Sequence, residues 1–177
     1  VRENVKLSKT EAADFILSEH MRRRNTAMFE DAEHQDRSIA EKPWNAIIGR
    51  GKDNRVQIGR DFPMRIMAEI LDAPLLKEEE VLRRAKYYVE NGARVVDVGM
   101  LAGEARPDDA KRIVTLLKRR LPAPISIDTL NAEEIEAGLF SGADMILSLN
   151  SQNLDKIKCP KGSEETAVVV IPERVDV

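Results

Sequence analysis

Residues 94–129 read RVVDVGMLAGEARPDDAKRIVTLLKRRLPAPISIDT, and this stretch decides the fold. It opens with an apolar run of strand length, continues with helical spacing of its apolar residues over 108–121, and returns to an apolar run over 125–129. A strand, a helix and a second strand that is apolar throughout are typical of a parallel sheet whose faces are covered by helices. The stretch therefore predicts an α/β fold.

The same alternation continues on both sides of this stretch. Before it, an apolar run over 65–72 is followed by helical spacing over 77–91. After it, the pattern predicts a helix over 132–141 and strands over 144–149 and 166–171. The spacing of about 20–30 residues suits βα units. We therefore expect five parallel strands, in βα units that begin at residue 65.

Two segments precede these units. Residues 1–44 are polar and helix-favouring, with a capping-box spacing near their start, and predict a helical leader. Residues 45–60 hold two short segments separated by the turn-forming Gly51-Lys-Asp-Asn54, which predicts a β-hairpin. The expected organisation is thus a leader over 1–44 and the βα region with its hairpin over 45–177.

Composition limits the class of protein. The chain has 177 residues, of which 42% are hydrophobic, and 28 Lys+Arg face 31 Asp+Glu. This near balance of charge argues against a nucleic-acid partner, which requires a basic excess. No apolar run approaches the ~18 residues of a membrane span, so no membrane association is expected. The single cysteine, Cys159, cannot form an internal disulfide, which favours a cytoplasmic protein.

Polar residues recur where the predicted strands end. The turn after the first strand lacks the glycine-rich pattern of a dinucleotide or P-loop site, which argues against a doubly wound nucleotide fold. A single aspartate at a strand end is more often a helix cap or loop former, but several on successive strands indicate the active-site end of a TIM barrel. The residues concerned are Asp72, Asp97, Asp128, and Ser148 or Asn150.

Three of these strand motifs resemble those of dihydropteroate synthase and the wider pterin-binding TIM-barrel family. They are Gly92-Ala-Arg-Val-Val-Asp-Val-Gly99, Pro124-Ile-Ser-Ile-Asp-Thr129 and Ser141-Gly-Ala-Asp-Met-Ile146. The resemblance covers about residues 45–172 and implies a (β/α) TIM barrel of the pterin-binding type, of which this chain holds the five N-terminal strands after a helix and a hairpin. Within that family, the segments around Ile58 and Ala68 are most similar to proteins associated with tetrahydromethanopterin biosynthesis.

The resemblance implies a reaction and a set of residues. The family joins a pterin carrying a 6-hydroxymethyl diphosphate to an arylamine and releases pyrophosphate, in folate or tetrahydromethanopterin biosynthesis. By this resemblance Asp128 is the catalytic candidate, and Asp97 lines the pterin pocket. Asp72 lies near the family's asparagine that helps to hold Mg²⁺ and pyrophosphate. Arg106 belongs to an amine or anion pocket, and Asn150 replaces a pterin-binding asparagine if the strand end bends.

Other readings remain open at this point. A pterin-dependent methyltransferase that acts on a corrinoid protein would use similar aspartates without a diphosphate. A non-catalytic pterin-binding domain is favoured by Leu147, which stands where the family has its strand-four asparagine. A (β/α)₈ barrel needs about 250 residues, so we expect a longer native protein, or a partner segment or homo-oligomer that completes the barrel.

Overall fold

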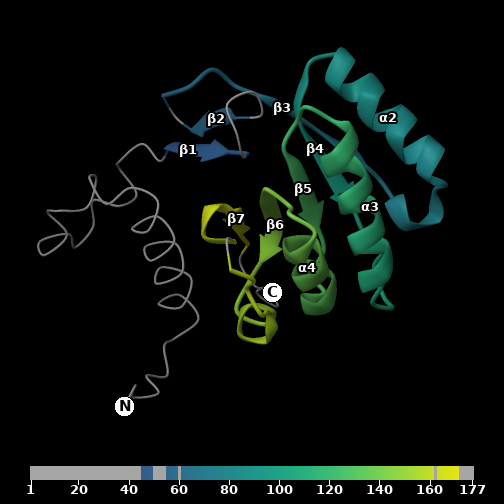
Figure 1. Cartoon of the computed structure of the whole chain (residues 1–177). Helices are drawn as coiled ribbons and strands as arrows, with labels where there is room; N and C mark the ends of the chain where they lie inside the picture. The colour runs from purple at the N-terminus through teal and green to yellow at the C-terminus, as the bar shows by residue number, and fades with distance from the viewer. Residues whose placement is uncertain (1–44, 50–54, 60, 162, 172–177) are drawn as a thin grey trace, which may run out of the picture.

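The computed structural model describes residues 45–49, 55–59, 61–161 and 163–171, so the predicted leader over 1–44 lies outside the described residues. Figure 1 shows the arrangement of the elements. The strands are β1 (Asn45–Ile48), β2 (Val56–Gly59), β3 (Ile66–Ile70), β4 (Ala93–Gly99), β5 (Ile125–Asp128), β6 (Met145–Leu149) and β7 (Ala167–Val170). The helices are α2 (Glu78–Glu90), α3 (Pro107–Arg120) and α4 (Ala132–Phe140), with short 3₁₀ turns η3 (Ala73–Leu75), η4 (Leu154–Lys156) and η5 (Ser163–Glu165).

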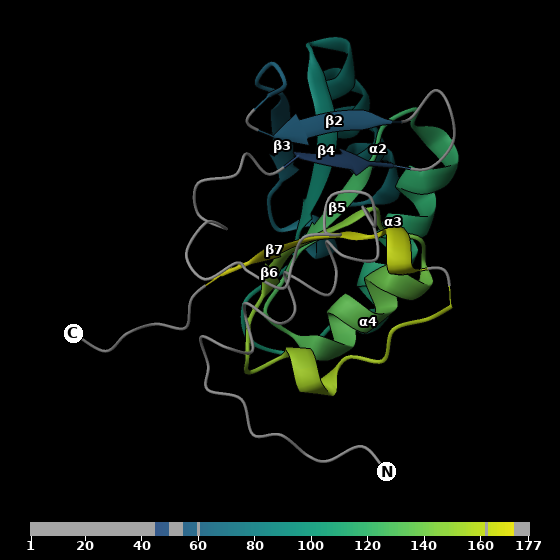
Figure 2. The same cartoon turned by 90° about the vertical axis from the view of Figure 1, so that its left-hand side faces the viewer.

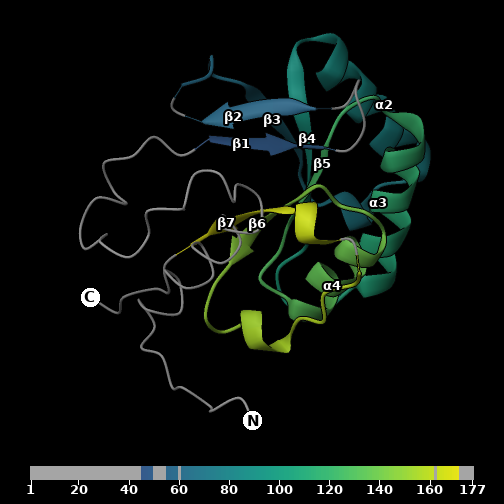
Figure 3. The same cartoon turned by 60° about the vertical axis from the view of Figure 1, so that its left-hand side comes forward.

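The main sheet confirms the predicted α/β fold. Its five strands are parallel and follow one another in the order β3-β4-β5-β6-β7. Consecutive parallel strands that are also spatial neighbours are the arrangement from which a (β/α) barrel is built. The helices α2, α3 and α4 lie together on one side of this sheet (Figure 3).

The hydrophobic core lies between the sheet and these helices. Alternate residues of the strands face the helices, because side chains in a strand point to opposite sides of the sheet in turn. On β4, for example, Val96 and Val98 belong to this core, whereas Asp97 between them does not. The principal core members are Ile70, Val81, Ala85, Val96, Val98, Ile113, Val114, Leu117, Ile125, Ile127, Ile135, Leu139 and Ile146.

The helices begin and end at signals that the sequence carries. Three glutamates fill the first turn of α2, and α3 begins at Pro107 and ends with three basic residues. These charges oppose the partial charges of the helix ends. Gly92 follows α2 with a φ of 99°, a left-handed conformation that glycine adopts without strain. In the described part of the chain, no helix has the length and apolar character needed to span a membrane.

The first turn of α4 provides a test of stability. The side chain of Asn131 accepts hydrogen bonds from the backbone N–H groups of Glu133 and Glu134, at 2.9 and 3.2 Å. We expect Asn131→Ala to lower the free energy of unfolding by about 1 kcal/mol, because two N–H groups lose their partner. A urea titration measures this loss. Asn131→Ser keeps a capping oxygen and should stay close to wild type, and equal stability of Asn131→Ala would contradict the assigned cap.

The predicted hairpin is present as an antiparallel pair of short strands. β1 and β2 pair from Asn45 opposite Gly59 to Ile48 opposite Val56. Ile48 is buried against Met145 of β6 and Ala167 of β7, in a small apolar cluster separate from the main core. Figure 2 shows the hairpin lying across one end of the parallel strands. It therefore covers apolar side chains that the helices do not reach.

Candidate functional site

Three carboxylates meet on neighbouring strands, on the side of the sheet away from the helices. They belong to Glu69 of β3, Asp97 of β4 and Asp128 of β5, and one oxygen of each lies within 4.8 Å of the others. The strand register produces this meeting, because Glu69 pairs with Asp97, and Asp128 pairs with Gly99 two residues further along β4. The cluster thus lies near the carboxyl ends of three successive parallel strands, where TIM-barrel enzymes place their active sites.

Asp97 forms the buried floor of this cluster. Only 2% of its surface is exposed, and its Oδ1 atom has no hydrogen-bond partner among the described residues. Burial raises the pKa of Asp97 to about 6, the nearby hydroxyl of Ser126 offsets part of this rise, and the charges of Asp128 and Glu69 add to it. A buried carboxylate oxygen without a partner is costly unless a ligand supplies a donor.

Asp128 is held in place from the next strand. It is partly exposed, and the hydroxyl of Ser148 on β6 donates a hydrogen bond to its Oδ1 atom. By the resemblance, an asparagine that contacts the pterin is expected at position 147, next to Ser148. Here β6 instead provides the Ser148 hydroxyl, which orients Asp128. Asp128 and Asp97 are the two predicted site residues that the structure brings together.

Glu69 is a member of the cluster that sequence reasoning missed. Glu69 is exposed, but partial desolvation raises the pKa of its carboxyl group, and the charges of Asp128 and Asp72 raise it further. Polar residues at the ends of the predicted strands pointed to Asp72 instead of Glu69. A usable signal was the alternation along β3, where Glu69 lies between the partly buried Ala68 and the buried Ile70.

Asp72 lies beside the cluster and outside it. It is exposed, precedes η3 with a left-handed φ of 49°, and its side chain makes no capping hydrogen bond. Aspartate adopts this conformation more readily than most residues. Its charge contributes to the raised pKa of Glu69. The Asp72 carboxylate therefore lies near the edge of the carboxylate cluster.

Arg106 and Asn150 lie in loops at the same end of the sheet, and both are engaged locally. The guanidinium of Arg106 is 3.8 Å from Asp109, at the long end of an ion pair. The buried Asn150 accepts hydrogen bonds through Oδ1 from the backbone N–H groups of Gln152 and Asn153, at 2.9 and 3.1 Å. The structure therefore uses the Asn150 side-chain oxygen to shape the loop that follows β6.

A buried glutamate ties two of these loops together. Glu134 of α4 is 1% exposed, and it accepts hydrogen bonds from the backbone N–H of Arg106 at 2.7 Å and from the hydroxyl of Thr129. Thr129 directly follows Asp128, so this contact fixes the loop after β4 against the end of β5. The Asn131-to-Glu134 spacing resembles a capping box, in which the glutamate would accept a hydrogen bond from the backbone N–H of Asn131. Here the Glu134 side chain instead accepts from Arg106 and Thr129, in the two loops.

An open depression of about 420 Å³ lies among the same loops. Leu130 and Asn131 line it from the end of β5, Asn150 and Asn153 from the end of β6, and Ala105 from the loop after β4. Its lining combines apolar and polar side chains and includes one cation, Lys156, and one acidic residue, Glu133. The carboxyl end of the sheet thus offers both a carboxylate cluster and, on the neighbouring loops, room for a second group.

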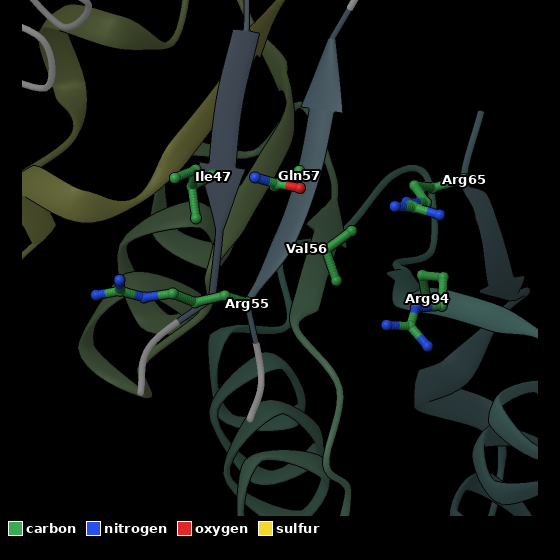
Figure 4. Close-up of a pocket in the computed structure, with 6 residues that line it drawn as sticks. All are labelled: Ile47, Arg55, Val56, Gln57, Arg65 and Arg94. Atoms are coloured by element: carbon green, nitrogen blue, oxygen red, sulfur yellow. The ribbon is translucent and has the colours of Figure 1, made fainter. Parts of the chain in front are cut away.

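The opposite end of the sheet is basic. A depression of about 390 Å³ lies between the hairpin and the starts of β3 and β4, and Arg55, Arg65 and Arg94 are among its lining residues. Figure 4 shows Arg65 and Arg94 extending toward the hairpin, whereas Arg55 extends away from them. No acidic side chain lines it within the described segments. The two ends therefore differ in charge, and the acidic end is the candidate site.

Solved structures and one curated relative are similar to this chain. Dihydropteroate synthase of Coxiella burnetii in complex with pteroic acid is 24% identical with a TM-score of 0.47, covering 60% of this chain and 40% of that one. The Burkholderia cenocepacia enzyme complexed with 7,8-dihydropteroate is 27% identical with a TM-score of 0.43, covering 51% and 35%. An uncharacterized protein of Methanocaldococcus jannaschii is 37% identical over 172 residues, which are 96% of this chain and 31% of that protein. The chain thus spans about a third of that relative.

The family model described as pterin binding enzyme matches residues 72–173, which is more than half of the chain. The match begins at the turn after β3 and includes β4, β5, β6 and β7. It therefore includes Asp97 and Asp128 and the loops that surround them, and it confirms the resemblance inferred from the strand motifs. The chain belongs to the pterin binding enzyme family.

Proposed function

We propose that the protein is a dihydropteroate synthase-like transferase, which joins a 6-hydroxymethyl-dihydropterin diphosphate to an arylamine and releases pyrophosphate, in folate or tetrahydromethanopterin biosynthesis. One observation carries the proposal: in a chain of the pterin binding enzyme family, the buried Asp97 has an oxygen with no hydrogen-bond partner among the described residues, and it lies beside Asp128. This pair of carboxylates suits a ligand that is rich in N–H donors.

The pterin ring supplies such donors. Its amino-pyrimidine edge carries neighbouring N–H groups, and hydrogen bonds from them to ionised carboxylates are worth roughly 1.5–3 kcal/mol each. Asp97 lies deepest and would fix the edge of the ring, whereas the partly exposed Asp128 would lie closer to the reacting side. In this proposal the two aspartates orient the ring so that its methylene faces the loops.

The reaction itself places demands on charge. The bond between the methylene carbon and the diphosphate oxygen breaks, a carbon–nitrogen bond to the arylamine forms, and the amine loses a proton. Positive charge develops on the methylene and ring as pyrophosphate leaves. A fixed carboxylate such as Asp128 stabilises that charge more in the transition state than in the ground state, which is what accelerates the step.

The remaining predicted residues have supporting roles in this proposal. Asp72 offers one exposed carboxylate at the edge of the cluster, and Mg²⁺ is commonly held by one or two carboxylates together with substrate phosphates. Mg²⁺ bound there would neutralise the departing pyrophosphate. Arg106 belongs to a loop beside the depression at the same end, where the arylamine would bind. Asn150, which is expected to contact the pterin, lines the same depression.

The test is a product assay on the full-length protein. We expect the protein to release pyrophosphate when given 6-hydroxymethyl-7,8-dihydropterin diphosphate, Mg²⁺ and an arylamine, and to form the corresponding pterin–amine conjugate, detected by chromatography. Omission of the amine should abolish conjugate formation. Methyl transfer from a reduced methylpterin to a corrinoid acceptor, without pyrophosphate release, would instead identify a methyltransferase. Pterin binding without turnover in either assay would indicate that the protein is a non-catalytic pterin-binding domain.

A further inference from the structure

We propose that Glu69 is a third ligand-contacting carboxylate of the pterin site and acts with Asp97 and Asp128 to accept the N–H donors of the heterocycle. This inference rests on the proposed function, because it names a further residue of the same site. Glu69 lies outside the residues that the family model matches, and the strand motifs did not single it out.

The strand geometry places Glu69 toward the site. It pairs directly with Asp97 in the parallel register of β3 and β4. Its neighbour Ile70 belongs to the core beneath the helices, so the side chain of Glu69 points to the other side of the sheet, as that of Asp97 does. Its carboxylate oxygen then lies within 4.8 Å of oxygens of both aspartates.

Gly99 makes room for this side chain. A Cβ atom added at Gly99 would lie 2.3 Å from Glu69 Oε1, and its three nearest atoms would all belong to Glu69. Any side chain at position 99 would therefore displace the glutamate. Gly99 pairs with Asp128 across β4 and β5, so the Glu69 carboxylate reaches over β4 toward the third member of the cluster.

In the part of the chain that the structure describes, the three carboxylates of the cluster lack cationic partners, which favours the binding of a ligand that donates hydrogen bonds. Among the described residues, no Lys or Arg forms an ion pair with Glu69, Asp97 or Asp128. Three like charges this close disfavour one another. Within the described structure, Asp97 Oδ1 is buried and has no hydrogen-bond partner, so the cluster holds one acceptor that its own side chains leave unsatisfied. A donor-rich heterocycle satisfies several of these oxygens at once.

The experiment measures the dissociation constant of 6-hydroxymethylpterin for the full-length protein by fluorescence or calorimetry. We expect Glu69→Ala to weaken binding about tenfold, as for the loss of one hydrogen bond to a charged group. Gly99→Ala should weaken binding similarly, because it displaces the glutamate. The double variant should lose about tenfold and not a hundredfold, since the two changes act through one contact. Glu79→Ala, at an exposed glutamate of α2, is the matched control.

The outcomes separate this inference from the proposed function. If the wild type does not bind the pterin, the proposed function and this inference both fail. If the wild type binds and Glu69→Ala binds equally well, the inference alone is overturned. The remaining alternative is that Glu69 binds a cation, and a titration with Mn²⁺ alone, followed by electron paramagnetic resonance, tests it. If Mn²⁺ binding depends on Glu69 and the pterin affinity of Glu69→Ala is unchanged, Glu69 belongs to a cation site and the proposal is overturned.

Discussion

An Asp128→Asn variant of the full-length protein is expected to bind 6-hydroxymethylpterin about ten- to a hundredfold more weakly than wild type. The substitution keeps the shape of the side chain and one oxygen that can accept from Ser148, but it removes the negative charge. A hydrogen bond to a charged acceptor is worth roughly 1.5–3 kcal/mol, which corresponds to this range of affinity. Fluorescence or calorimetric titration measures the change.

The kinetics of the same variant separate binding from catalysis. If Asp128 also stabilises the charge that develops as pyrophosphate leaves, kcat falls in addition to the loss of affinity. Glu79→Gln, at an exposed glutamate of α2, removes the same charge away from the cluster and should leave both quantities unchanged. An Asp128→Asn variant with wild-type affinity and wild-type kcat would remove Asp128 from the proposed site.

The fold could be predicted closely because its determinants are local. The apolar run expected over 125–129 is β5 at Ile125–Asp128, and the helix expected over 132–141 is α4 at Ala132–Phe140. Alternation of buried runs with amphipathic spacing sets the type of each element, and Asn131 and the prolines set the boundaries. The parallel order then follows, because each helix returns the chain to the same end of the sheet.

The site could be predicted only in part, because its contacts join different strands. Asp97 and Asp128 stand at strand ends with a recognisable motif, so both could be predicted from the sequence. Glu69 escaped selection because its role depends on the register between β3 and β4 and on the space above Gly99. The hydrogen bonds that occupy Asn150 in its own loop are likewise visible only in three dimensions.

The charge of Asp97 should affect stability in the direction opposite to its effect on binding. An Asp97→Asn variant is expected to unfold with a free energy about 3 kcal/mol higher than wild type at pH 7–8, and to show little of this difference near pH 4. Urea titrations of both proteins between pH 4 and 8 measure it. A difference between Asp97→Asn and wild type that stays constant over this range would contradict the burial of an ionised Asp97.

The sign follows from the raised pKa of Asp97, which is about 6 in the folded protein against an ordinary value of 3.8. Below pH 4 the carboxyl group is protonated in both states and contributes nothing. Between about pH 4 and 6 the unfolded chain releases the proton and the folded protein keeps it, so rising pH favours unfolding. Above pH 6 the loss is complete, and about two pH units correspond to roughly 3 kcal/mol. Asparagine avoids this cost but cannot accept the pterin N–H groups as an anion, so a variant that gains stability and loses affinity would identify Asp97 as a residue kept for its ligand.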